Sequence, residues 1–216
     1  MRIIGGEHRG RRIAAPKGRA TRPMLDRVRE AVFSSAAPWL AEARVLDLFA
    51  GSGSLGLEAL SRGAASARFV EGNERTAGLL RDNLRELGAA ERGQVVVGDA
   101  LAPRTWAAAS RGPFDLVFLD PPYPMITEPQ TRMRVLETLD LLLREALAPD
   151  GLIVLHVPRL ALDRRALPSA AEAAERAYGT NAVWYVTPPE DDLPASASAD
   201  TDAPSEPPPS SDGSRP

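Results

Sequence analysis

Short apolar runs alternate with amphipathic segments through the middle of the chain. In Arg75–Leu87, for example, leucines recur at helical spacing, and Gly88 then provides a natural helix end. The pattern predicts helices at Asp26–Ala37, Leu55–Ser61, Arg75–Leu87 and Met133–Leu147. It predicts strands at Arg44–Phe49, Ala67–Glu71, Gln94–Val97, Asp115–Leu119 and Leu152–Val157, with two weaker strands near Ala173–Tyr178 and Ala182–Thr187. This alternation favours an α/β fold in which helices cover both faces of a parallel sheet.

The two ends of the chain differ from this middle part. Around Gly5, Gly6 and Gly10, the segments Arg2–Ile4 and Arg11–Ala14 predict a small hairpin. From about Pro189 onward the chain is rich in Pro, Ser, Ala, Asp and Glu and cannot bury enough apolar surface to offset its ordering entropy. We therefore predict an N-terminal extension over residues 1–40, an α/β domain over residues 41–188 and a disordered tail over residues 189–216.

Composition narrows the class of protein. The chain has 216 residues, of which 44% are hydrophobic and 25% charged, as in ordinary globular proteins. The absence of cysteine excludes a disulfide scaffold, a thiol nucleophile and a thiolate metal site. No apolar stretch approaches the ~18 residues of a membrane span, and no secretory signal is visible. We therefore expect a cytoplasmic protein without a membrane partner.

The formal net charge of −3 conceals a segregation of charge. Residues 1–35 hold nine basic and three acidic residues, whereas residues 189–216 hold seven acidic residues and one arginine. A basic segment on a near-neutral body indicates a polyanionic partner, although a solvated charged face gives the same pattern. The candidate phosphate-contacting residues are Arg9, Arg11, Arg12, Arg22, Arg27 and Arg29.

A glycine-rich segment, Asp47–Gly56, links the strand predicted at Arg44–Phe49 to the following helix. Its Gly51, Gly53 and Gly56 fit the G-x-G-x-x-G spacing, which lets a backbone turn tightly and approach a ligand closely. The motif by itself is also typical of dinucleotide dehydrogenases. Asp47 disfavours a dinucleotide, because its carboxylate would repel a pyrophosphate and suits a cationic amino group.

Two more acids mark the next two predicted strands, with Glu71 at the end of one and Asp99 shortly after the other. Glu71 can accept hydrogen bonds from both hydroxyls of a ribose, and Asp99 or its neighbouring amides can meet an adenine edge. Open parallel sheets bind ligands at the carboxyl ends of their strands. Each acid alone could be a solvated loop carboxylate, but together they favour S-adenosylmethionine (AdoMet). The candidate cofactor-binding residues are Asp47, Phe49, Ala50, Gly51, Ser52, Gly53, Glu71, Asp99 and Ala100.

The strand predicted at Asp115–Leu119 leads directly into Asp120-Pro121-Pro122-Tyr123. Each proline fixes φ and lacks an N–H, so this turn is rigid and presents carbonyl acceptors. Asp120 and the Pro121 carbonyl can accept the two N–H groups of an exocyclic amine, which orients its lone pair and stabilises developing positive charge. Tyr123 can stack on a flipped base. The four residues are therefore candidate catalytic residues for methyl transfer to such an amine, and this chemistry needs no metal.

With both motifs in place, residues 1–187 resemble the RsmD family, bacterial methyltransferases that act on the exocyclic N2 of one guanine in 16S ribosomal RNA. The resemblance is carried by Met1–Gly6, Arg9–Arg11, Thr21–Pro23, Asp26–Phe33, Asp47–Gly53, Phe69–Glu71, Asp120–Tyr123 and Tyr178–Thr180. It implies a Rossmann-like, seven-strand AdoMet-dependent methyltransferase domain with catalysis by the Asp120–Tyr123 turn. The implied partner is 16S rRNA or the assembling small ribosomal subunit, and we expect a monomer.

The sequence departs from this family at two places. His156 stands near the end of a strand where family members usually carry a glutamate, and Gly72-Asn73 replaces a charged pair after Glu71. We interpret His156 as a structural residue. Two other functions stay open. A DNA adenine-N6 methyltransferase would use the same tetrapeptide, but a separate target-recognition domain is missing. A non-catalytic RNA-binding ribosome-assembly factor would have lost the motifs that are intact here.

Overall fold

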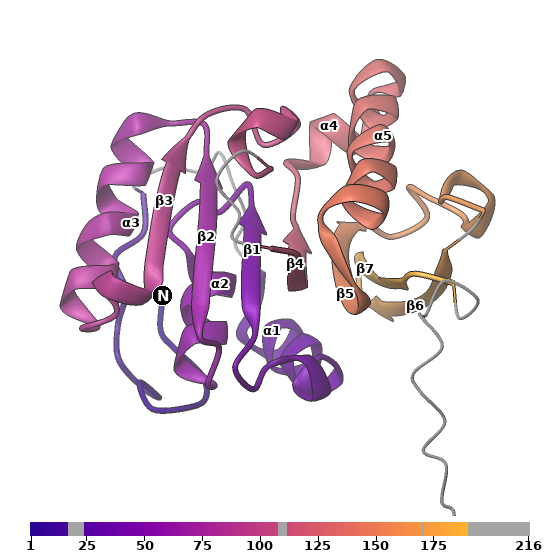
Figure 1. Cartoon of the computed structure of the whole chain (residues 1–216). Helices are drawn as coiled ribbons and strands as arrows, with labels where there is room; N and C mark the ends of the chain where they lie inside the picture. The colour runs from indigo at the N-terminus through magenta and orange to yellow at the C-terminus, as the bar shows by residue number, and fades with distance from the viewer. Residues whose placement is uncertain (17–23, 108–111, 170, 190–216) are drawn as a thin grey trace, which may run out of the picture.

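The computed structural model describes residues 1–16, 24–107, 112–169 and 171–189, which form a seven-stranded sheet. The strands lie in the order β3-β2-β1-β4-β5-β7-β6 (Figure 1). They are β1 (Arg44–Leu48), β2 (Ser66–Glu71), β3 (Gly93–Val97), β4 (Phe114–Leu119), β5 (Leu147–Pro158), β6 (Glu172–Tyr178) and β7 (Asn181–Thr187). Strands β1 to β5 pair in parallel, and β7 runs antiparallel to β5 and β6. The α/β class is confirmed, and β1 to β5 form the parallel sheet that the pattern favours. The two weaker strands at the C-terminal end depart from it, because the tight turn between β6 and β7 reverses the chain.

Helices cover both faces of the sheet. They are α1 (Asp26–Ser35), α2 (Ser54–Ser61), α3 (Glu74–Glu86), α4 (Tyr123–Thr127) and α5 (Pro129–Glu145), with short 3-10 turns η1 (Ala37–Trp39), η2 (Ala90–Arg92), η3 (Pro103–Thr105) and η4 (Arg164–Ala166). Alternate strand residues face opposite layers. Val45 packs with the side of α1, α2 and α3, whereas Leu46 packs with the side of α4 and α5. Within the described residues, none of these helices is long and apolar enough to cross a membrane.

The predicted element boundaries need one clear correction. The helix predicted at Met133–Leu147 begins at Pro129 and ends at Glu145, because a proline at the first helical position is pre-organised for a helix. Leu147 belongs instead to β5, where it pairs with Phe114 of β4. The disordered tail was predicted over residues 189–216, and residues 190–216 of it lie outside the described residues. The division of the chain at residues 40 and 188 stays a prediction.

The basic N-terminal segment folds back on itself as predicted. Arg2 and Arg12 form an antiparallel bridge, and the Ile3 N–H donates to the Arg11 carbonyl at 2.9 Å. Ile3 and Ile13 are buried in the same apolar cluster as α2 and the sheet. The hairpin is therefore packed onto the α/β core.

A buried acid on α2 holds this hairpin in place. Glu58 is fully buried, and its carboxylate accepts hydrogen bonds from the N–H groups of Ile4 and Gly5, each at 2.7 Å. Arg62, one helical turn further on, donates to the same carboxylate at 2.7 Å. A buried charge needs such partners. Glu58 therefore connects the hairpin to the helix that begins at the glycine-rich loop.

Gly56 lets α2 approach β2 closely. A Cβ atom on Gly56 would lie 2.2 Å from the Phe69 ring, which is fully buried on β2. Gly78 on α3 offers a contrast, because nothing lies within 4 Å of the place where its Cβ would stand.

We predict that Gly56→Ala destabilises the protein by about 1–3 kcal/mol, the range for overpacking a core. Gly78→Ala should instead leave stability unchanged or raise it by up to about 1 kcal/mol, because alanine is the better helix former. Denaturant unfolding of both variants measures the difference. Equal stabilities of the two variants would contradict the close approach of α2 to Phe69.

Candidate active site

The parallel register places the ends of β1, β2 and β4 side by side. Leu48 at the end of β1 pairs with Val70 of β2 and with Leu119 at the end of β4. The next residue after β4 is Asp120, whose N–H points to the Leu48 carbonyl at 3.5 Å. The motifs that the sequence placed at three strand ends therefore meet at the same edge of the sheet.

The glycine-rich loop is a tight turn with left-handed backbone. Phe49, Gly51 and Gly53 have φ angles of 61°, 57° and 83°. The Gly53 N–H donates to the Ala50 carbonyl at 2.8 Å, and a Cβ on Gly53 would lie 2.2 Å from Leu80 of α3. A Cβ on Gly51 would have no neighbour closer than 4.0 Å, so this glycine borders open space in the described structure. Ala50 and Ser52 are buried beneath the loop, and Phe49 is partly exposed.

Asp47 is the buried acid of the site. Its side chain is almost inaccessible, and its Oδ2 accepts the N–H of Gly56 in the first turn of α2 at 2.9 Å. Burial raises the pKa of Asp47 to about 7, and the negative charges of Asp120 and Glu71 act in the same direction. The three carboxylates are thus close enough to influence one another. Such a site favours a cation, which would stabilise the ionised form of Asp47.

Glu71 ties the glycine-rich loop to the end of β2. Its two carboxylate oxygens accept the N–H groups of Gly51, at 2.9 Å, and Asn73, at 2.8 Å. Each oxygen keeps further acceptor capacity, because a carboxylate offers about four lone-pair sites. The partly exposed Glu71 carboxylate can therefore also accept two adjacent hydroxyl groups from a ligand over the loop.

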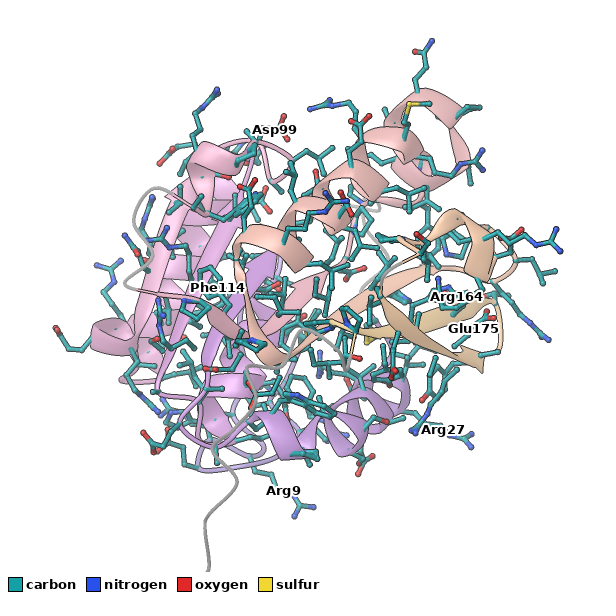
Figure 2. The ribbon with its side chains drawn as sticks, turned by 45° about the vertical axis from the view of Figure 1, so that its right-hand side comes forward. Arg9, Arg27, Asp99, Phe114, Arg164 and Glu175 are labelled. Atoms are coloured by element: carbon teal, nitrogen blue, oxygen red, sulfur yellow. The ribbon has the colours of Figure 1, made fainter. Side chains whose placement is uncertain are left out.

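Asp99 lies further along the same edge, at one end of the molecule (Figure 2). Its Oδ1 accepts the Leu101 N–H at 3.0 Å, and its Oδ2 forms an exposed ion pair with Arg134 of α5, also at 3.0 Å. Ala100 is buried beside it. Sequence reasoning missed Arg134, because nothing in the helical pattern distinguishes it from other surface arginines.

The Asp120–Tyr123 turn connects β4 to α4. Pro121 is buried, Pro122 is partly exposed, and the side chain of Asp120 is 30% exposed. Asp120 Oδ1 lies 2.8 Å from Nδ1 of the buried His156 on β5. The Tyr123 hydroxyl donates to the side-chain carbonyl of Asn181 at the start of β7. The turn is therefore held by the side chains of His156 and Asn181. Sequence reasoning did not include them in the site, because they lie 36 and 58 residues along the chain from Asp120 and Tyr123.

The structure separates the basic hairpin from the acids. Arg11 donates a hydrogen bond to the carbonyl of Glu86, the last residue of α3. Because α3 precedes β3 in the chain, this contact places Arg11 near the amino end of β3, whereas the acids lie at the carboxyl ends of the strands. Figure 2 shows Arg9 and Arg27 at the end of the molecule opposite to Asp99. Arg9, Arg11, Arg12 and Arg27 are exposed, and Arg22 lies outside the described residues.

The expectation that Arg29 contacts RNA is wrong. Arg29 is fully buried, and its Nη2 donates to the Arg2 carbonyl at 2.7 Å and to Asp26 at 3.0 Å. Its position on α1 faces the core, because Val28, Arg29, Val32 and Phe33 share the buried side of that helix. Arg29 therefore braces the N-terminal hairpin from inside and cannot reach an external phosphate.

Comparison with protein families identifies the family of this chain. The family model described as "Conserved hypothetical protein 95" matches residues 1–187, which is most of the chain. The chain belongs to this family, the RsmD family. The resemblance stated from the motifs is thereby confirmed.

Relatives named ribosomal RNA small subunit methyltransferase D match more than half of the chain. Ribosomal RNA small subunit methyltransferase D of Escherichia coli K12 is 44% identical over 123 residues, which are 57% of this chain and 60% of that relative. The enzyme of the same name from Haemophilus influenzae is 38% identical over 123 residues, covering 57% of this chain and 64% of the relative. These matches thus span less than two thirds of either relative.

Solved structures extend the similarity over more of the chain. The yhhF protein of Escherichia coli is 34% identical, with a TM-score of 0.72 over 88% of this chain and 98% of that one. A Thermus thermophilus protein is 32% identical, with a TM-score of 0.68 over 87% of this chain and 99% of that one. An rRNA methylase from Streptococcus thermophilus is only 15% identical, with a TM-score of 0.57 over 78% of this chain, so it shows the fold alone. The chain has the seven-strand methyltransferase fold.

The buried Asp47 makes a testable contribution to the stability of this RsmD-family protein. Its folded-state pKa of about 7 lies above the ordinary value of 3.8, so the folded state binds the proton more tightly than the unfolded state. The free energy of unfolding should therefore fall as the pH rises from about 4 to about 7.

We predict that Asp47→Asn removes this loss and makes the protein more stable than wild type at pH 8, by on the order of 1–4 kcal/mol. Denaturant unfolding at pH 5 and pH 8 measures it. Asp82→Asn, at an exposed position on α3, is the control and should follow the wild-type pH dependence. If Asp47→Asn also follows the wild-type curve, Asp47 ionises without penalty in the folded protein.

Proposed function

We propose that the protein transfers a methyl group from AdoMet to the exocyclic N2 amine of a guanine in 16S rRNA. The observation that carries the proposal is the position of the Asp120–Tyr123 turn, directly beside the end of β1 and the glycine-rich loop. The names of the RsmD relatives support small-subunit rRNA as the substrate. The family-wide resemblance supports the N2 amine of guanine as the acceptor.

The strand-end acids fit AdoMet by their chemistry. Asp47 is a buried carboxylate whose ionisation a cationic amino group would favour. Glu71 holds the loop and has lone pairs left for the ribose hydroxyls. Asp99 and the amide of Ala100 suit the polar edge of adenine. Phe49, Ala50, Gly51, Ser52 and Gly53 form the turn over which the cofactor would lie, with the open side at Gly51. AdoMet supplies an activated methyl group on its sulfonium.

The Asp120–Tyr123 turn suits an amine as methyl acceptor. An exocyclic amine on a purine is a poor nucleophile, because its lone pair is delocalised into the ring. Hydrogen bonds from the amine to Asp120 and to the Pro121 carbonyl would hold it in one orientation and stabilise the positive charge that develops on nitrogen. The base must leave its stack to reach this turn, and Tyr123 would stack against it.

The RNA substrate has to extend beyond the flipped nucleotide if the basic hairpin contributes to binding. Arg9, Arg11 and Arg27 lie at the opposite edge of the sheet from Asp99. Strands of five or six residues are roughly 17–20 Å long. An RNA in contact with both edges must therefore cross the whole height of the sheet.

Incubation with labelled AdoMet tests the proposed reaction. Purified protein is given small-subunit rRNA, assembling small subunits or genomic DNA, and the methylated nucleoside is identified after digestion. We expect N2-methylguanosine from the ribosomal substrates. N6-methyl-2′-deoxyadenosine from DNA would replace the proposal with a DNA methyltransferase, and no product from any substrate would favour a non-catalytic assembly factor.

Two acid variants should separate catalysis from cofactor binding. We predict that Asp120→Ala abolishes methyl transfer and leaves AdoMet affinity close to wild type. Glu71→Ala should instead weaken AdoMet binding by about 1–3 kcal/mol, the scale for losing hydrogen bonds to a charged group. Calorimetry with AdoMet and the transfer assay measure the two effects. A loss of AdoMet affinity in Asp120→Ala equal to that in Glu71→Ala would contradict the assignment of Asp120 to the target amine.

Neutralising the exposed hairpin arginines tests the RNA contact. We predict that Arg9→Gln/Arg11→Gln/Arg12→Gln weakens rRNA binding and lowers the slope of log affinity against log salt by about 0.7–0.9 for each phosphate that the protein no longer neutralises. AdoMet affinity should not change. The charge-matched control replaces Arg75, Arg104 and Arg144, which are exposed on other elements. Equally weakened binding in the two triple variants would show a general effect of charge and no specific role of the hairpin.

A further inference from the structure

The acid of the Asp120–Tyr123 turn is paired with a buried histidine. The strand register places the two residues next to each other, because Leu119 of β4 pairs with Leu155 of β5 and each is followed by one member of the pair. His156 is 3% exposed, and its Nδ1 lies 2.8 Å from Asp120 Oδ1. One of the two carboxylate oxygens of Asp120, the group proposed to accept a hydrogen bond from the target amine, is thus already in contact with His156.

The two nitrogens of the His156 ring have different surroundings. On the β7 side of β5, His156 lies opposite the buried Val183, and the Tyr123 ring of α4 stands edge-on with its centroid 6.0 Å away. Asp120 is the charged group in contact with the ring among the described residues. His156 Nε2 is buried and has no hydrogen-bond partner within the same residues.

The difference between Nδ1, which contacts Asp120, and Nε2, which has no partner among the described residues, favours one tautomer of the His156 ring. A proton on Nδ1 gives the short contact a donor, and the Asp120 oxygen then accepts it. A proton on Nε2 would leave a buried N–H without an acceptor, which is costly, and would leave Nδ1 facing the carboxylate lone pairs. A neutral ring protonated on Nδ1 therefore satisfies the arrangement best.

We propose that His156 is a positioning residue for methyl transfer. Its Nδ1–H fixes the rotation of the Asp120 carboxylate and leaves Oδ2 to accept an N–H of the target amine. The exposed part of the Asp120 side chain, 30% of it, is what a substrate can still reach. Tyr123 is held in the same unit through Asn181, so β5, α4 and β7 together orient the turn. This role rests on the proposed function, but the His156–Asp120 hydrogen bond does not.

Ring nitrogen chemical shifts test the hydrogen bond independently of any activity. The chain has only two histidines, His8 and His156, so a ¹⁵N-labelled His8→Gln variant leaves a single imidazole to observe by NMR. We expect protonated Nδ1 and unprotonated Nε2 at neutral pH. In Asp120→Leu the preference should disappear, giving a mixture of tautomers or an inverted pattern. Protonated Nε2 with bare Nδ1 while Asp120 is present would overturn the proposal.

Kinetics of two His156 variants test the positioning role. In His156→Asn the side-chain amide can replace the Nδ1 donor, whereas His156→Leu has similar size and no donor. We expect His156→Leu to lower kcat by about 10- to 100-fold, as for a misplaced reacting group, without changing the KM for AdoMet. His156→Asn should recover most of kcat. Tyr185→Phe on the neighbouring strand β7 is the control and should keep the wild-type kcat.

The outcomes separate this inference from the proposed function. If wild type methylates rRNA and both His156 variants are equally impaired, His156 has only a structural role and the inference fails. If wild type methylates no substrate, the proposed function fails, while the NMR result still decides whether His156 holds Asp120. If His156→Leu does not fold, the comparison of His156→Asn with wild type and the Asp120→Leu spectrum still test the pair.

Discussion

The parallel pairing of β1 with β4 is the constraint on which the rest of the site depends. Strands β2 and β3 extend the sheet on one side of β1, and β4 and β5 extend it on the other, so the strand order reverses at β1. Open α/β sheets bind ligands at such a switch point, beyond the carboxyl ends of the strands. A slip of one residue in this pairing would turn Asp47 to the opposite face of the sheet and move Asp120 away from it.

Electrostatics then decides what this edge of the sheet can hold. Asp47, Glu71 and Asp120 bring three carboxylates to one place, and the protein compensates them with N–H groups from Gly56, Gly51 and Asn73 and with the His156 ring. These donors orient the acids but do not neutralise them, which is why burial still raises the pKa of Asp47. A cationic ligand would complete the site, because it would stabilise the ionised form of Asp47.

Much of this arrangement is predictable from sequence, because its signals are local. The glycine-rich loop, the three strand-end acids and the Asp120–Tyr123 turn follow from short apolar runs and the residues that end them. What sequence reasoning missed depends on long-range packing. Arg29 and Arg27 look alike on α1, and only the helix orientation buries the first. The antiparallel direction of β7 has no signature in its apolar pattern.

The two strands β1 and β4 are far apart in the sequence, and this separation affects the order in which the site forms during folding. The backbone N–H of Arg44, at the start of β1, donates a hydrogen bond to the carboxylate of Asp115, at the start of β4. These two residues are 71 positions apart in the sequence, whereas β6 and β7 are joined by a tight turn. Closing a long loop costs more chain entropy and is slower than forming a hairpin. We expect a partly folded chain to form its C-terminal hairpin before Asp47 meets Asp120. Such a chain would contain every residue of the candidate site, and yet the site itself would not have formed.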